Sequence, residues 1–369
     1  FTNQKYIQEY QEKNPHLFNN ITFVYVRPSK KLTFWYKEWE RLERLYYCIW
    51  QRKAYQVARK LNKKEHFDCV QHLTYVTCIM PTYMHKLNIP FIYGPIAGGE
   101  RIPSIIGYPM EKKDYLIELI RSLTLNIPKI SLNSQRAFKH AKKIIVVTES
   151  TKKLVPPKYH YKTKIHQAIS IDDAFFEPKP NFDDKKLNNT CRILIAGRML
   201  GWKGFELGIT AAKIALQKGA DIDLTVLGSG SETHFTKLKD LSMPYLNDKI
   251  HFVSSVPYEK MKKFYDSFDL LLNCSLRDSG CLVVMESMSR GLPVICVNTG
   301  GPQVNTTSDT AIKIDPKPFQ NMAEETEANS VFRPDGIRRT DPHHQAGPVR
   351  TNPCINFLKS VNKRHQAAA

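Results

Sequence analysis

The chain has 369 residues, 42% of them hydrophobic and 24% charged, and its formal net charge is +19. This length exceeds what one hydrophobic core commonly serves, so two domains are expected. No run of about 18 uninterrupted apolar residues occurs, which excludes the usual signal of a membrane-spanning helix, and the first residues lack a signal-peptide pattern. The chain begins at Phe1, without Met, inside a helical pattern, and we expect it to be a fragment.

The first half alternates helical patterns with apolar strands. Helices are predicted at residues 4–13, 80–87 and 110–140, and strands at 21–26, 67–76, 90–95 and 142–150. Apolar strands separated by helices favour a parallel sheet that is covered on both faces. Ligands of such sheets bind beyond the carboxyl ends of the strands, where His72 and the sequence Gly98-Gly99-Glu100 are expected to lie.

Two alternatives stay open for each of these features. His72 can act in catalysis or be a hydrogen-bonded structural residue. Gly98 and Gly99, followed by Glu100, can form a nest of N–H groups for an anion or a simple turn.

A basic and aromatic segment lies near the start of the chain. Residues 27–64 contain twelve Lys or Arg and three acids, interleaved with Phe34, Trp35, Tyr36, Trp39, Tyr46, Tyr47 and Trp50. Apolar residues at steps of three and four predict an amphipathic helix over 34–61. Such a helix suits an anionic membrane surface. Nucleic acid is a second possible partner, and a domain helix with core aromatic residues and solvated charges is the third interpretation.

The second half begins after a segment rich in Pro, Asn and charge, residues 177–189, which predicts an interdomain linker. Strands are predicted at 191–197, 222–230, 249–256 and 270–276, with helices at 205–219, 232–241 and 258–268 between them. This alternation predicts a doubly wound parallel sheet.

The candidate site is centred on residues 273–302, which predict a strand end, a tight loop, a helix, a second strand and a Gly-Gly-Pro turn. Gly280 allows the backbone to approach a ligand, and the following helix presents free N–H groups. Asp278 lies at the mouth of the turn, and Glu286 is expected two turns into the helix, roughly 12 Å further along its axis. The alternative is an ordinary βαβ unit with solvated acids.

Two cations belong to the same edge of the sheet. Arg198 and Lys203 bracket the loop after the first strand of the second half, and Gly228 and Gly230 form a flexible turn after the second. Arg and Lys bind phosphate oxygens, although both residue types are more commonly surface cations. Neither a dinucleotide-binding fingerprint nor a P-loop is present.

Four motifs follow one another in this half: GRMLGWKG at 197–204, VLGSG at 226–230, RDSGCLVVMESMSRGLPVI at 277–295 and NTGGP at 298–302. Together they resemble the nucleotide-sugar half of the retaining glycosyltransferases of family 4, which have the GT-B fold. Residues 67–77 and 90–100 also resemble the acceptor domain of a bacterial polysaccharide-forming branch. The family commonly has Glu where Asp278 stands, and a T-x-H sequence where Tyr93-Gly94-Pro95 stands.

The resemblance implies a role for each matching residue. Arg198 and Lys203 would neutralise the diphosphate that leaves, Glu286 would hold the ribose hydroxyls, and Asp278 would hold hydroxyls of the transferred sugar. Cations and a helix N-terminus stabilise the charge that develops on the diphosphate, so neither a metal nor a cofactor is expected. The predicted donor-binding residues are Gly197, Arg198, Lys203, Gly228, Gly230, Gly280, Cys281, Leu282 and Glu286. The predicted catalytic residues are Asp278, Glu286 and His72, and the predicted acceptor-side residues are Gly98, Gly99 and Glu100.

The predicted fold is α/β, with two doubly wound Rossmann-like domains facing each other and an incomplete N-terminal domain. The boundaries are 1–176 for the acceptor side, 177–190 for the linker, 191–320 for nucleotide-sugar binding, and 321–369 for a disordered or non-native tail.

The predicted function is transfer of a hexose from a nucleoside diphosphate sugar to a glycan or lipid-linked acceptor, with retention of configuration. An inactive nucleotide-sugar-binding fragment and a basic nucleic-acid-binding protein are the alternatives. Reduced core cysteines, such as Cys191 and Cys296, favour the cytoplasm, and the basic first half favours the inner face of the cell membrane.

Overall fold

The structure is a computed structural model that describes residues 3–27, 43–171, 175 and 190–330. Its contacts divide the chain into two compact units. The first unit comprises Phe1–Gly94 and Pro128–Ile144, and the second comprises Pro95–Ile127 and Ile145–Ala369. The domain boundaries predicted from the sequence stay a prediction.

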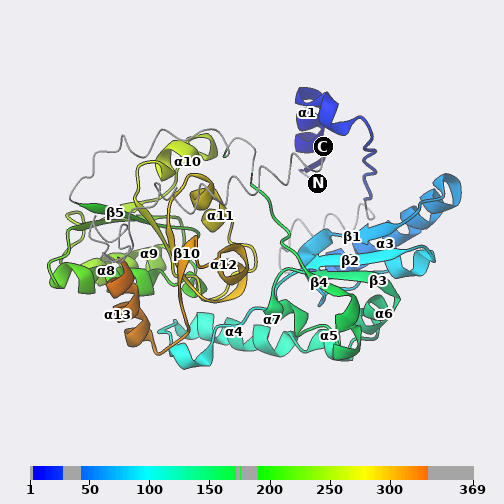
Figure 1. Ribbon diagram of the computed structural model, residues 1–369. Coiled ribbons are helices and arrows are strands. Elements are labelled where there is room, and N and C mark those ends of the chain that lie inside the picture. The colour runs from blue at the N-terminus through cyan, green and yellow to red at the C-terminus, as the bar shows by residue number, and fades with distance from the viewer. Residues whose placement is uncertain (1–2, 28–42, 172–174, 176–189, 331–369) are drawn as a thin grey trace, which may run out of the picture. The chain divides into compact units, whose positions relative to one another are not determined.

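Two parallel sheets confirm the predicted α/β class. The smaller has the order β1-β2-β3-β4 (Figure 1). Its strands are Val70–His72, Phe91–Ile96, Ala141–Val146 and Thr163–Ile165. β1 is shorter than predicted because residues 74–76 turn into a 3-10 helix, in which Tyr75 has a positive φ of 59°.

The first unit contains helices α1 (Asn3–Lys13), α3 (Glu43–Glu65) and α6 (Leu132–His140), and α5 (Ile127–Ile130) runs across its boundary. α1 ends before Pro15, as predicted. The predicted helix at 80–87 is reduced to a 3-10 turn, Met84–Leu87. The predicted strand at 21–26 is wrong. Its residues are extended but largely exposed, and they pair with no strand among the described residues.

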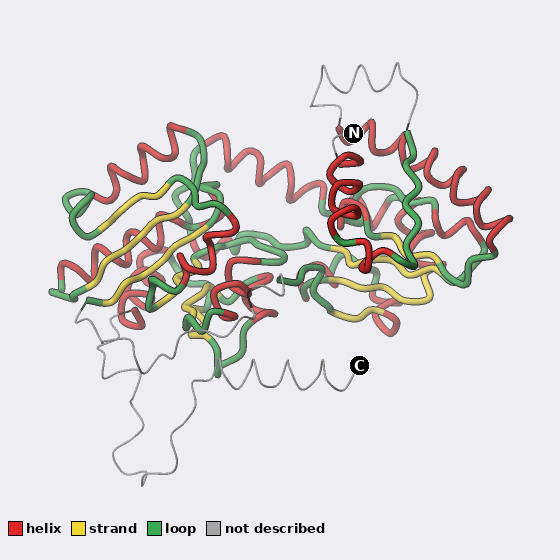
Figure 2. Tube along the Cα trace, turned by 90° about the horizontal axis from the view of Figure 1, so that it is seen from above, coloured by secondary structure: helices red, strands yellow, loops and turns green. Residues whose placement is uncertain are grey.

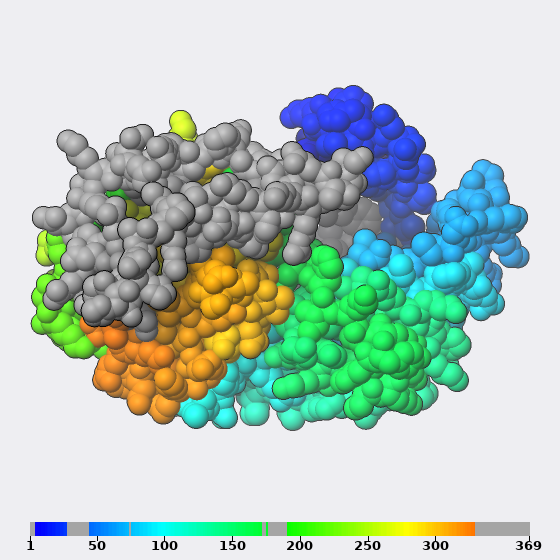
Figure 3. Space-filling view, in the orientation of Figure 1, coloured from blue at the N-terminus to red at the C-terminus, as the bar shows by residue number. Residues whose placement is uncertain are grey.

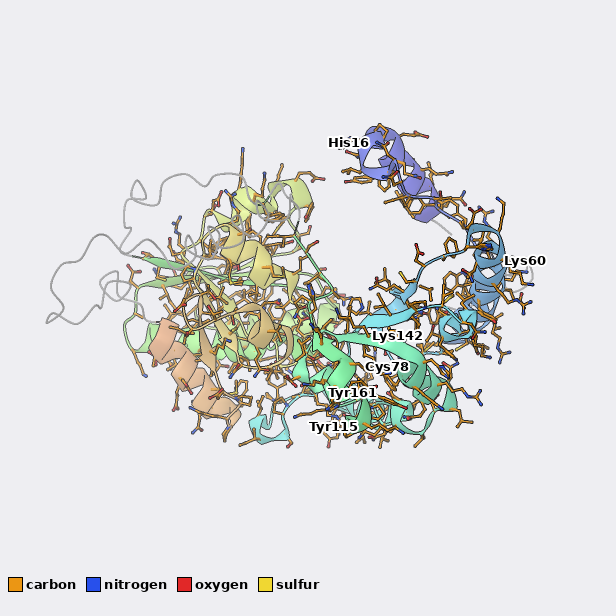
Figure 4. All side chains as sticks on the ribbon, turned by 45° about the vertical axis from the view of Figure 1, so that its right-hand side comes forward. His16, Lys60, Cys78, Tyr115, Lys142 and Tyr161 are labelled. Carbon is orange, nitrogen blue, oxygen red and sulfur yellow. The ribbon has the colours of Figure 1, made fainter. Side chains whose placement is uncertain are left out.

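Helix α3 covers only part of the predicted basic helix, since residues 34–42 lie outside the described residues. Tyr47 is buried, and its ring lies 5.9 Å from that of Trp50 and 4.1 Å from that of Tyr75. Cations such as Lys60, labelled in Figure 4, are exposed on the other side. This part of the helix therefore fits the interpretation of core aromatics and solvated charges.

The larger sheet, in the second unit, has the order β10-β9-β8-β5-β6-β7, and every printed pairing in it is parallel. Its strands are β5 (Cys191–Ala196), β6 (Ile222–Leu227), β7 (Ile250–Val253), β8 (Leu270–Asn273), β9 (Val294–Val297) and β10 (Ala311–Ile314). Order and direction confirm the doubly wound arrangement predicted for this part.

Helices cover both faces of this sheet (Figure 2). One apolar cluster joins the sheet to α8 (Phe205–Gln217), α9 (Glu232–Ser242) and α13 (Phe319–Ser330). A second cluster joins the opposite face to α10 (Tyr258–Tyr265) and α11 (Leu282–Ser289). The unit also contains α4 (Lys112–Thr124), α7 (Glu149–Lys152) and α12 (Gly300–Asn305).

Helix α13, orange in Figure 3, corrects the prediction that the chain loses its fold from residue 321. Met322 and Ala323 are fully buried against the sheet-covering helix α8. The sequence of α13 does not indicate an amphipathic helix, because only a few of its residues are apolar. Residues 331–369 lie outside the described residues.

None of the helices in the described ranges combines the length and the hydropathy that crossing a bilayer requires.

Candidate functional site

The strand order of the larger sheet reverses between β5 and β8. The chain proceeds from β5 to β6 on one side, and from β8 to β9 on the other. In open parallel sheets, ligands bind where such a reversal opens a crevice at the carboxyl ends of the strands. The loops that follow β5 and β8 are therefore the ones that sheet topology favours as a ligand site.

Three contacts join these two loops. The Leu276 N–H donates to the Trp202 carbonyl at 3.0 Å. The Arg277 guanidinium lies 4.3 Å from the centre of the Trp202 ring. Lys203 Nζ forms an ion pair with Asp278 Oδ2. The structure thus brings together two residues that the sequence placed 75 positions apart.

Arg198, the other predicted cation, is exposed. Its guanidinium makes no hydrogen bond or ion pair with another described residue. Arg198 is therefore free to bind an anion, whereas Lys203 is already paired.

The predicted glycines of this edge lie in two adjoining turns. Gly197 N–H donates to the Leu227 carbonyl at 3.0 Å, and Met199 N–H donates to the Ser229 carbonyl at 2.8 Å. A Cβ at Gly228 would overlap the Gly197 carbonyl, and one at Gly230 would come 2.6 Å from the Met199 carbonyl. Only glycine at these positions lets the two turns approach so closely.

The turn before α11 contains a left-handed residue that the sequence does not indicate. This residue is Cys281, with φ of 55°. Asp278 Oδ1 accepts a hydrogen bond of 3.2 Å from the Cys281 N–H, which supports that strained turn. Gly280 is needed for packing, because a Cβ there would lie 2.9 Å from Ile169 Cδ1. Leu282, the first residue of the helix, is partly exposed.

Glu286 lies closer to the helix start than predicted. Because α11 begins at Leu282, Glu286 is one turn into it rather than two. The side chain is buried, and the Tyr265 hydroxyl donates to its Oε2 at 2.8 Å. Burial raises the pKa of Glu286, and the Tyr265 hydrogen bond opposes this only in part. No described residue donates to Oε1, which leaves an acceptor for a ligand hydroxyl.

Side chains of the same unit form hydrogen bonds with the Gly98-Gly99-Glu100 segment. Glu100 is buried, and Oε1 accepts from the hydroxyls of Thr148 at 2.6 Å and Thr151 at 3.0 Å. The Gly98 N–H donates to Ser279 Oγ at 3.3 Å, and the Gly99 N–H to Thr151 Oγ1 at 3.2 Å. Both N–H groups are therefore occupied, and the interpretation as an open anion nest is wrong in this conformation. The acceptor-side role stays a prediction.

Ser279 was missed in the sequence. Its hydroxyl donates to Glu100 Oε2, and it is the residue next to Asp278. Glu100 thereby holds the loop that carries the predicted sugar-binding acid. A sequence separation of 179 residues gave no local signal for this contact.

A second missed group lies beside the Arg198 loop. His234 Nδ1 is 3.2 Å from the Met199 carbonyl, and Nε2 is 3.1 Å from Glu206 Oε1. Both ring nitrogens therefore face acceptors, which favours the imidazolium. The hydrogen bond to Glu206 raises the pKa of His234. Burial alone would raise the pKa of Glu206, but hydrogen bonds from His234 and Tyr108 outweigh it and lower that pKa.

His72 belongs to the first unit, where it ends β1. It is buried, and its ring lies edge-on to Tyr93, with centroids 5.8 Å apart. Its catalytic role stays a prediction.

Among the described residues, no group of three or more His, Cys, Asp or Glu side chains is arranged to hold a metal ion.

Residues 178–327 match the family described as glycosyl transferases group 1. Protein CapJ of Staphylococcus aureus is 24% identical over 224 residues, 54% of this chain and 54% of CapJ. An uncharacterized glycosyltransferase of Haemophilus influenzae is 29% identical over 157 residues, 42% of each chain. The chain thus spans about half the length of the curated relatives it matches. The apo form of the lipopolysaccharide outer core galactosyltransferase WaaB is 13% identical, with a TM-score of 0.49 over 89% of this chain and 82% of WaaB.

Proposed function

We propose that the chain transfers a sugar from a nucleoside diphosphate sugar to a hydroxyl group of an acceptor, since residues 178–327 match the group 1 glycosyl transferases. The observation that carries the proposal is the meeting of the two loops at the strand reversal. There, Arg198 and the Lys203–Asp278 pair lie on loops next to the first turn of α11.

The donor is oriented by its diphosphate. Arg198 and Lys203 bind phosphate oxygens, assisted by the N–H group of Leu282, where α11 presents its positive end. The Cys281 N–H is already bound to Asp278, so Cys281 acts through the turn that it forms. Glu286 Oε1 accepts from the ribose hydroxyls, and Asp278 accepts from hydroxyls of the sugar. Gly197, Gly228 and Gly230 let the backbone approach the nucleotide.

In the reaction, the bond between the anomeric carbon and the diphosphate oxygen breaks, and a bond forms between that carbon and the acceptor oxygen. The acceptor proton passes to the departing diphosphate, and the acceptor attacks on the face from which the diphosphate leaves. Configuration is therefore retained. The two cations and the helix end stabilise the charge that grows on the diphosphate in the transition state.

The acceptor is a glycan or a lipid-linked glycan, and the Gly98–Glu100 segment is the acceptor side of the second unit. The protein works at the inner face of the cell membrane. The aromatic side of α3 is used in packing, so only its exposed cations remain to attract anionic lipid. The seven described cysteines are free thiols, as in a reducing compartment.

The test is a thermal-shift screen of UDP-, GDP- and ADP-sugars, followed by calorimetry and by transfer of a radiolabelled sugar to glycan and lipid-linked acceptors. We expect one donor to raise the melting temperature and to be consumed, with the product anomer identical to that of the donor by NMR. Binding without turnover would favour an inactive binding module. An absence of binding to every donor would refute the proposal.

A further inference from the structure

Helix α4 turns its polar face toward the protein. The Asp114 carboxylate lies beside the backbone of Gly201, in the loop after β5. Glu118 Oε2 is 3.3 Å from Arg277 Nε, in the loop after β8. α4 therefore packs against both loops of the candidate donor site through its acids.

Arg121 continues this inward face one turn later. It donates to the carbonyls of Gly98 and Glu100, each at 2.6 Å, and its guanidinium lies 3.3 Å from Glu118. Leu125, which follows the helix, is buried. The positions 114, 118, 121 and 125 follow the spacing of one helical face.

The apolar side chains of α4 lie on the remaining surface. They are 44% to 66% exposed: Tyr115, Leu116, Ile117, Leu119, Ile120 and Leu123. At about 100° per residue, Leu116, Ile120 and Leu123 lie opposite Glu118. A helix of a water-soluble domain has the reverse arrangement, with its apolar face buried. Contiguous exposed apolar side chains of this kind mark an interaction surface.

Charge indicates what this surface meets. Lys112 and Lys113 stand exposed in the first turn, while the acids Asp114 and Glu118 are turned inward. Glu111, just before the helix, is an exposed acid. The outward surface thus combines leucine, isoleucine and one tyrosine with lysines, as in helices that lie in a bilayer interface. Figure 4 labels Tyr115 on this helix.

We propose that the outward face of α4, residues 112–123, docks onto an anionic lipid bilayer, with its apolar side chains among the acyl chains and its lysines at the headgroups. The proposal rests on the membrane location within the proposed function and gives it a surface different from the basic segment at 34–61. Since the inward face of α4 holds Gly201 and Arg277, docking places the donor loops next to the lipid. A lipid-linked acceptor would meet them there.

The experiment is co-sedimentation of the whole chain with vesicles of phosphatidylcholine, alone or mixed with phosphatidylglycerol, without donor. The test variant carries Leu116→Gln, Ile120→Gln and Leu123→Gln, since glutamine preserves helix propensity. The matched control carries Tyr161→Gln and Met243→Gln, which are exposed apolar residues elsewhere in the same unit. Hydrogen exchange with and without vesicles locates the protected segment.

We expect the triple variant to lose at least about tenfold in partition coefficient, and the control to bind like the parent. Lys112→Gln with Lys113→Gln should weaken binding to anionic vesicles about fivefold per lysine at low salt, and little at high salt. Protection should include residues 112–123. Equal binding by the triple variant, or protection confined to other segments, would overturn the proposal.

A second copy of the chain is the competing occupant. If sedimentation velocity shows that the triple substitution turns a dimer into a monomer while vesicle binding is unchanged, α4 is a dimer interface and the proposal fails. Donor-induced thermal stabilisation of the same variant reports separately on the proposed transfer function, so the two proposals can fail independently.

Discussion

Lys203 and Asp278 form an ion pair across the strand reversal of the larger sheet. The cation proposed for the leaving diphosphate is thus held by the carboxylate proposed for the transferred sugar. Both side chains are largely shielded from water, so the pair is stronger than an exposed one. A bound diphosphate has to compete with Asp278 for the Lys203 ammonium group. This competition couples recognition of the sugar by Asp278 to recognition of the diphosphate by Lys203.

Asp278→Asn separates these two roles. Removing the carboxylate charge releases Lys203, so calorimetry should show unchanged or up to about tenfold tighter binding of the free nucleoside diphosphate. Transfer of the sugar should fall, because its hydroxyls lose a charged acceptor. Asp269→Asn is the matched control. It breaks the Arg192–Asp269 pair, 3.0 Å long, at the opposite edge of the sheet, and should leave affinity unchanged. Weaker binding of the free diphosphate to Asp278→Asn would contradict the coupling.

Arg198→Gln and Lys203→Gln should weaken a nucleoside diphosphate more than the corresponding monophosphate. Each charge-assisted contact to phosphate contributes about 1.5–3 kcal/mol, so we expect losses of roughly tenfold or more for the diphosphate by calorimetry. Lys249→Gln removes a cation of the same sheet that faces Asp221 and Asp223 instead, and serves as the control. Equal losses of affinity for the monophosphate and the diphosphate would show that Arg198 and Lys203 do not bind the leaving diphosphate.

Glu286→Gln should reduce nucleotide affinity without reducing the stability of the fold. The buried carboxylate has a raised pKa, so its ionised form is disfavoured by folding, and a neutral amide relieves that penalty while still accepting from Tyr265. Affinity of the parent should also fall as the pH drops through a value above 4.5, as Glu286 becomes protonated. Calorimetry against pH, with thermal unfolding alongside, checks both effects. A large loss of stability in Glu286→Gln would show that the charge is structural.

The sequence predicted the sheet of the second unit well because its strands are buried on both faces and appear as continuous apolar runs. It predicted the loops less well. The left-handed backbone at Cys281 depends on a hydrogen bond from its N–H to Asp278, and no residue preference indicates it. The strand expected at 21–26 has the right composition but no described partner strand. The apolar pattern does not indicate α13, because its buried face is partly polar. That face contains Met322 and Ala323 but also Thr326 and Glu327.

Ser279→Ala should lower turnover more than donor affinity. It removes the hydroxyl that joins Glu100 to the residue beside Asp278 and leaves a buried carboxylate oxygen without that donor. We expect a loss of about 1–3 kcal/mol in unfolding free energy and a fall in kcat that exceeds the change in KM. Ser242→Ala, which removes a buried 2.8 Å hydrogen bond to the Leu238 carbonyl in α9, is the control for stability alone. If both variants lose stability equally and both keep full turnover, Glu100 has no positioning role.

His234 and Glu206 should make the stability of the second unit depend on pH. The pKa of His234 is raised in the fold, so its contribution is complete below its ordinary value of 6.5 and is lost as the pH rises through the raised value. The pKa of Glu206 is lowered, so its contribution is present above 4.5 and is lost as the pH falls through the lowered value. The pair therefore stabilises most between these ordinary values.

Thermal unfolding of the parent should consequently show a melting temperature that falls by a few degrees from about pH 6 to about pH 9. In His234→Gln that slope should be reduced, because glutamine still donates to Glu206 or to the Met199 carbonyl but carries no titrating charge. His166→Gln, at an exposed histidine of the same unit, should keep the slope of the parent. Identical slopes for the parent and His234→Gln would mean that His234 is neutral in the fold. The loop that contains Arg198 would then be held without a charged imidazolium at His234.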